Sequence, residues 1–323
     1  MKRRQFGAML AAATFSLGGV GSAAADASAQ ETDPLQIADV SVSLGGITAS
    51  IGRATFAFDE GTMLLRATDW STEVAGEPMS IGEARVAVDG ADAETFATVR
   101  AAMVEAFESR SASSLVSALA DANVSEDAGV RTFLGSVETG GQLVADEIAA
   151  TGTVGSVVPS GSGELLQDGA SLSEVTALGA SEWSRLTIQL GDTELAANDV
   201  VMQRDGTALA LSSSGGSATL SGRTFDFEEM AMTVAPPETI PAAHVEFASR
   251  LRELADEGSL SLSSVQSAAE DSGVTVANTT EAVRNARFDL SFANVSEGGR
   301  TVVSNFETSG TLAELMTVLG QRV

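Results

Sequence analysis

The stretch that decides the fold is VSVSLG at residues 40–45, in which apolar and polar side chains alternate up to a glycine. The same pattern recurs as LTIQLG at residues 186–191. Strict alternation is typical of a β-strand with one buried face, because successive side chains of a strand point to opposite faces. We therefore expect one β-structure to occur twice in this chain.

Three further pairs of segments follow in the same order. They are 59–65 with 204–210, 137–141 with 295–299, and 171–175 with 311–315. Four blocks in one linear order predict a tandem duplication of a domain-sized unit, and chance similarity in a chain rich in Ala, Gly and Ser is the alternative. The predicted domains are unit one (residues 30–179) and unit two (residues 180–323), after an N-terminal segment of residues 1–29.

Each unit begins with period-two alternation and then changes to helical spacing. Strands are expected at 37–44, 54–58, 62–67, 84–88, 186–190, 200–203, 208–211, 218–220 and 229–234, and hairpins at 132–149 and 287–306. Helices are expected at 92–107, 112–122, 171–178, 242–255 and 312–319. The predicted fold class is α+β: two tandem homologous domains, each an antiparallel β-meander with helices packed on one face.

The N-terminus carries the only lysine, Lys2, followed by Arg3, Arg4 and Phe6 and by a mild Gly/Ala-rich stretch at 7–25. This segment resembles a twin-arginine translocation signal, with an ordinary secretory signal as the alternative. The resemblance implies recognition of Arg3, Arg4 and Phe6 by an export machinery that carries folded proteins, and an extracellular or cell-surface location. Cleavage is expected after Ala25 or Ala29. No later segment has the roughly 18 consecutive apolar residues of a membrane helix, so we expect no transmembrane anchor in the mature chain.

Charge is the second compositional signal. The chain has 44 acidic and 18 basic residues and a net charge of −26. Self-repulsion of this size opposes folding at low salt and is quenched in molar salt, where the Debye length falls to about 3 Å. The composition resembles that of exported haloarchaeal proteins, with a moderately acidic mesophilic protein as the alternative. It disfavours nucleic acid and anionic membranes as partners and favours diffusely held hydrated cations.

The residues offer little for catalysis. The chain has no cysteine and a single histidine, His244, which lies in an expected helix without a nucleophile-elbow motif elsewhere. The acidic clusters at 89–94 and 226–229 do not follow the calcium-loop spacing. We therefore assign no catalytic, cofactor-binding or metal residue. Asn123, Asn278 and Asn294 lie in N-x-Ser/Thr sequons and are candidate N-glycosylation sites.

These observations predict a secreted or cell-surface-associated, noncatalytic binding or structural protein of a halophilic archaeon. A soluble carrier of an apolar or lipid ligand is the first alternative, and a cavity well above about 300 Å³ is its expected mark. A carboxylate-dependent hydrolase is the second alternative, and it requires a buried pair of acids in a cleft.

Overall fold

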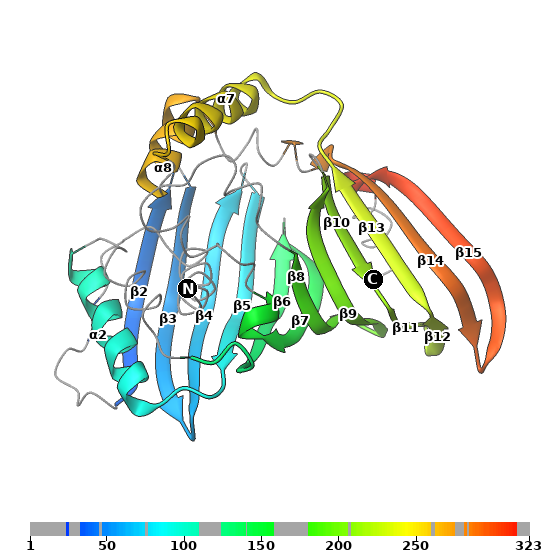
Figure 1. The fold of residues 1–323 in the computed structure, drawn as a ribbon, viewed down its shortest axis with the longest axis horizontal. Helices are drawn as coiled ribbons and strands as arrows, with labels where there is room; N and C mark the ends of the chain where they lie inside the picture. Colours follow the sequence, from blue (N-terminus) through cyan, green and yellow to red (C-terminus); the bar gives the residue numbers. More distant parts are fainter. Residues whose placement is uncertain are drawn as a thin grey trace.

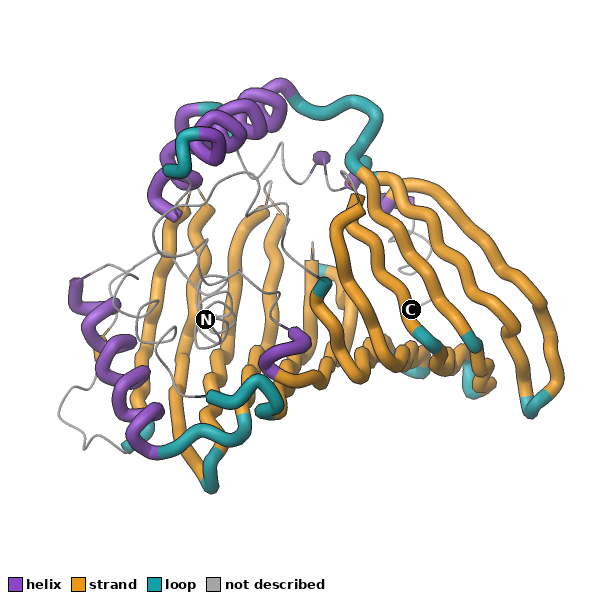
Figure 2. Tube along the Cα trace, in the orientation of Figure 1, coloured by secondary structure: helices purple, strands orange, loops and turns teal. Residues whose placement is uncertain are grey.

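The protein is mostly antiparallel β-sheet. The structure is a computed structural model that describes residues 24–25, 33–44, 47–74, 77–109, 124–139, 141–157, 180–205, 208–259, 262–274, 281–282 and 284–314. Strands make up 61% of the described residues and helices 21%, as the orange and purple segments of Figure 2 show. The described strands form one sheet of 15 strands.

Unit one contains six long strands with a helix between the fourth and the fifth. A two-residue strand, β1 (Ala24–Ala25), pairs with the edge of the first of them. The elements are β2 (Leu35–Leu44), β3 (Ile47–Asp59), β4 (Thr62–Val74), β5 (Glu77–Val88), α2 (Ala93–Ser109), β6 (Gly129–Thr139), β7 (Gln142–Thr153) and the short α4 (Val154–Val157). Each strand pairs with the next one in the chain, so unit one is an antiparallel meander.

Unit two has the same order of elements, with two of its strands interrupted. The elements are β8 (Ser181–Leu190), β9 (Thr193–Asp205), β10 (Ala208–Ser213), β11 (Gly215–Leu220), β12 (Arg223–Phe227), β13 (Glu229–Ala235), α7 (Ala242–Asp256), α8 (Leu262–Asp271), β14 (Arg287–Glu297) and β15 (Arg300–Thr311). Both β10 and β11 pair with β9, so together they take the place of β4. In the same way, β12 and β13 take the place of β5.

The predicted α+β class is wrong, because the two units share one sheet and the helices do not form a layer on each unit. The last strand of unit one, β7, pairs with the first strand of unit two, β8, with Ile148 opposite Ile188. The ladder therefore crosses from one unit to the other without a break (Figure 1). Among the described helices, α2 and the four-residue α4 bury apolar side chains in the core of unit one, whereas α7 and α8 lie away from β13–β15 (Figure 1).

A row of interruptions, which we call the crease, crosses the strands near their middles. The ladders skip one residue pair without changing register at Gly52/Asp69, Asp69/Gly82, Gly82/Ser136 and Ser184/Asp199. Asp69, Ser136, Asp199 and Asn294 have left-handed φ values of 57°, 51°, 48° and 49°, and such a conformation favours Gly, Asn and Asp. At Gly52, an added Cβ would lie 2.9 Å from Cβ of Asp69.

The crease changes which residues of a strand face the core. In β4, Met63, Leu65 and Ala67 are buried on one side of Asp69, and Thr72 is buried on the other. The buried positions are odd-numbered before Asp69 and even-numbered after it. One continuous strand therefore contains two alternating patterns that are out of phase with each other.

The start of α2 is fixed by an aspartate cap. The backbone N–H of Thr95 donates to Oδ1 of Asp92 at 2.7 Å, which satisfies one of the free donors of the first helical turn. This backbone bond, together with the Thr95 hydroxyl, lowers the pKa of Asp92 below its ordinary value. The capped form is therefore the ionised carboxylate.

We expect Asp92→Ala to lower the melting temperature at neutral pH, with a smaller effect for the matched first-turn variant Glu94→Ala. Because the pKa of Asp92 is lower in the folded state, its contribution is complete above the ordinary aspartate pKa and is lost as the pH falls through the lowered pKa. Thermal unfolding followed by circular dichroism at neutral pH and below pH ~3 measures both effects. Equal losses at the two pH values would contradict this role.

Several sequence predictions lie outside the described residues. They are the signal residues Arg3, Arg4 and Phe6, the sequons at Asn123 and Asn278, and the helices expected at 112–122 and 171–178. Of the helix expected at 312–319, the structure describes residues 312–314 as helical.

Candidate functional site

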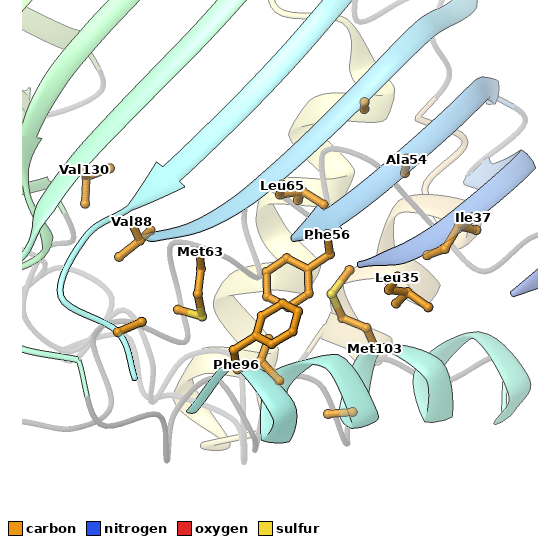
Figure 3. Packing of buried hydrophobic residues seen from close by; sticks show 14 of the residues in the cluster. Leu35, Ile37, Ala54, Phe56, Met63, Leu65, Val88, Phe96, Met103 and Val130 are labelled. Atoms are coloured by element: carbon orange, nitrogen blue, oxygen red, sulfur yellow. The ribbon is translucent and has the colours of Figure 1, made fainter. Parts of the chain in front are cut away.

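In unit one, α2 seals the inner face of the sheet. Phe96 and Val99 are fully buried and Met103 is 2% exposed. The ring of Phe96 lies 4.8 Å from that of Phe56 and 5.5 Å from that of Phe58, measured between centroids. Figure 3 shows Phe96 directed at Phe56, and Met103 near Leu35. This face is a closed hydrophobic core.

The corresponding face of unit two carries exposed apolar side chains and has no covering element among the described residues, and we call it the bare face. Its large apolar side chains with the greatest exposure are Leu209 (46%), Phe306 (46%), Leu220 (41%) and Val303 (38%). No described helix covers it, and in Figure 1 the three longer helices, α2, α7 and α8, lie on the side of β2–β5. Exposed apolar clusters of this kind on a soluble protein typically mark a binding surface.

The residues of the bare face are aligned across strands. Met230, Phe292 and Phe306 lie directly opposite one another on β13, β14 and β15, and directly paired residues share a face. The rings of Phe292 and Phe306 are 6.2 Å apart. Trp183 packs against the cores of both units, so the bare face continues the apolar surface that α2 covers in unit one.

Helix α7 follows β13 as α2 follows β5, but it does not occupy the equivalent place. It begins after Pro241, and its residue Val245 is 56% exposed. It packs against α8, where Ala268 is buried. In α2, by contrast, the apolar residues of the helix are buried against the sheet.

A second surface of unit two is an open trough of about 560 Å³ on the opposite face of the sheet. It crosses β9, β10, β13, β14 and β15 beside the crease, and its acidic lining residues are Asp199, Glu229 and Glu307. The hydroxyl of Ser214 donates to Oδ2 of Asp199 at 2.7 Å. No basic residue lines the trough among the residues described, so its chemistry is that of an acceptor for hydrogen-bond donors and cations.

Comparison with unit one explains why the trough is hollow. In unit one the cross-strand row is Arg66, Arg85 and Phe133, and in unit two the row at the same place is Ser212, Ala231 and Ser291. The long side chains of unit one fill the space. Arg66 binds Glu83 at 2.5 Å, and the guanidinium carbon of Arg85 lies 3.9 Å from the centre of the Phe133 ring.

If the protein were a soluble carrier of an apolar or lipid ligand, we would expect a cavity well above about 300 Å³. The trough exceeds the expected volume, and its lining combines three carboxylates and several serine hydroxyls with five apolar residues. Two of these, Met230 and Phe292, also belong to the bare face. The three carboxylates disfavour an apolar ligand in the trough, because burial of a charged group without a partner is costly.

The acidic clusters noted in the sequence have structural roles in the fold. Asp89 accepts from Thr62 at 2.9 Å and pairs with Arg131 at 2.8 Å. Glu228 accepts from the side-chain amide of Asn294 at 2.5 Å. Within the described part of the chain, no group of three metal-binding side chains is found.

The other predicted residues are dispersed. His244 lies in α7 and Asn294 in β14, at the crease. Asn294 is exposed, but its amide is engaged with Glu228, and its glycosylation remains a prediction. The buried polar or charged residues among those described are Thr72, Thr95, Arg100 and Ser213. A buried acid pair, which the hydrolase alternative requires, is therefore not formed by the described residues.

Among the described residues, no helix has both the length and the apolar character needed to cross a membrane. No protein-family model, curated protein or solved structure matches this chain. The assignment of function therefore rests on the physical features of the two units.

Proposed function

We propose that this protein is a noncatalytic binding protein whose bare face receives an amphipathic helix of a partner protein. The observation that carries the proposal is the difference between the two units. The same sheet face is sealed by a helix in unit one and left open in unit two, with Phe306 and Leu209 each 46% exposed.

Unit one supports a helix as the occupant. There, α2 inserts Phe96, Val99 and Met103, spaced at i, i+3 and i+7, into the sheet face. This is the spacing of one face of a helix. Because the strands of unit two follow the same order, its face has the shape that suits an element of this kind. Recognition of an amphipathic helix by an apolar groove is a common mode of peptide binding.

A peptide of residues 93–109 provides the probe, since it is the helix that unit one already binds. We expect the labelled peptide to bind the whole protein in molar salt, measured by fluorescence anisotropy. Phe306→Ser should weaken binding about tenfold to a hundredfold, because a buried phenylalanine contributes about 1.5–3 kcal/mol. A peptide carrying Phe96→Ser should bind more weakly for the same reason.

Asn305→Ser is the matched control. Asn305 precedes Phe306 on the same strand and is exposed, but it lines the trough on the opposite face of the sheet. Its replacement should leave peptide binding unchanged. If the wild-type protein does not bind the peptide, or if Asn305→Ser and Phe306→Ser weaken binding equally, the bare face is not the binding surface.

We also propose that the protein is exported and adapted to high salt. Two features of the sequence support this: the twin-arginine-like segment at Arg3, Arg4 and Phe6, and the net charge of −26. A negative surface in molar salt also makes apolar contacts the favoured mode of association, because screening removes long-range attraction between charges and salt strengthens apolar burial. The bare face fits that condition.

A further inference from the structure

Strand β15 ends the sheet with an open edge. It pairs with β14 on one side, and none of the described strands pairs with its other side. All residues from 300 to 309 are exposed, and the strand contains no proline or lysine. Natural proteins usually protect a long exposed edge with such residues, because its free N–H and C=O groups accept another strand.

Unit one shows which strand the equivalent edge accepts. Strand β7 takes the place of β15: Thr153 ends β7 opposite Gly129, and Thr311 ends β15 opposite Arg287. Residues 147–151 of β7 pair with residues 185–189 of β8. Strand β8 is the first strand of unit two, and its counterpart in unit one is β2.

The chain after each of these strands also begins in the same way. After β7, the N–H of Thr153 donates to the hydroxyl of Ser156 at 3.1 Å and opens α4. This helix is bound to β8, because the Ser156 hydroxyl donates to the Glu182 carbonyl at 3.0 Å. After β15, the N–H of Thr311 donates to Oε2 of Glu314 at 2.8 Å and opens a helical turn. A helical turn therefore starts directly after β15, as α4 starts directly after β7.

We propose that copies of this protein join head to tail, with β15 of one copy pairing antiparallel to β2 of the next. The β7–β8 register, transferred to these strands, places residues 305–309 opposite residues 39–43, with Glu307 opposite Ser41. On this edge of β2, the described residues of β1 pair with Ile37 and Ala38, and no described residue pairs there with residues 39–43. The two edges differ, so the contact is heterologous and extends to further copies.

The contact between copies involves strand edges and not the bare face, so it does not depend on the proposed function. Because the register of β15 against β2 is specified, cross-linking of chosen residue pairs can test it. The chain has no cysteine, so introduced thiols are the only ones present. Directly opposite residues have Cα atoms about 4.5–5.5 Å apart, within the range of a disulfide.

The experiment mixes two single variants, Ser41→Cys and Glu307→Cys, in molar salt under mild oxidation. We expect a disulfide-linked dimer that contains one copy of each variant. Ser309→Cys mixed with Ser41→Cys is the register control. Residue 309 lies two positions further along β15, which displaces its Cα by about 6.8 Å along the strand from the position opposite Ser41. We expect cross-linking of this pair to be at least about fivefold weaker. Sedimentation velocity of the wild-type protein should show mass that rises with concentration.

Three outcomes would overturn the proposal. The first is a wild-type protein that stays monomeric at all concentrations in molar salt. The second is equal cross-linking at Glu307 and Ser309. The third is cross-linking of Glu307→Cys with itself as efficient as in the mixture, since this result would indicate pairing of two β15 strands. Unchanged melting temperatures of the variants ensure that each outcome reports on assembly.

Discussion

Transfer of the protein without residues 1–29 from molar NaCl into dilute buffer is expected to abolish its native circular dichroism. The net charge of −26 becomes −28 when Lys2, Arg3, Arg4 and Asp26 are removed with this segment. The Debye length grows from about 3 Å at 1 M salt to about 30 Å at 0.01 M. Carboxylates that are screened from one another in high salt then repel across the whole molecule. The ion pairs do not offset this, because pairs such as Arg223–Glu297 are exposed and contribute about 0–1 kcal/mol each.

Sucrose in place of salt separates the two effects of concentrated NaCl. Sucrose favours compact states by exclusion from the protein surface but does not screen charge. We therefore expect sucrose in dilute buffer to restore much less native signal than NaCl does. A protein that keeps its native spectrum in dilute buffer without additives would show that charge repulsion is not limiting and would remove the support for salt adaptation.

Replacement of Phe96 by alanine is expected to destabilise the fold by about 3–5 kcal/mol. Phe96 is fully buried and stacks on Phe58 and against Phe56, so its loss leaves a cavity at the contact between α2 and the sheet. Urea unfolding in molar NaCl, followed by circular dichroism, measures the change. A loss of this size is a large part of the total stability of a domain.

Val245→Ala is the matched control in the other unit. Val245 lies in α7, which follows β13 in the chain as α2 follows β5, and is 56% exposed. We expect a change within about 0.5 kcal/mol, as for most surface substitutions. Similar losses for the two variants would mean that α7 is as firmly packed as α2 and that the bare face is covered in solution.

The sequence predicts where most strands lie but not how far they extend. In β3 the alternation predicts a strand at residues 54–58, whereas the strand spans Ile47–Asp59. The reason is the crease: at Gly52 and Asp69 the alternation changes phase, so a period-two pattern ends although the strand continues. Left-handed residues in mid-strand leave only a weak trace in sequence, because Gly, Asp and Ser also occur in turns.

The fold class and the binding surface were beyond sequence reasoning for a different reason. Periodicity identifies the apolar side of a strand but not what covers it. Phe56 and Phe306 both lie in predicted strands, yet Phe56 is 1% exposed and Phe306 is 46% exposed. Direct pairing of β7 with β8 depends on strand edges, which carry no pattern of their own, so two separate domains were expected where one sheet formed.

The crease also has a geometric consequence. In unit one the skipped residues Gly52, Asp69, Gly82 and Ser136 lie directly opposite one another on β3–β6. The change between odd and even buried positions therefore falls at the same level in these four strands. Because neighbouring strands change phase together, their apolar side chains stay on one face of the sheet on both sides of the crease.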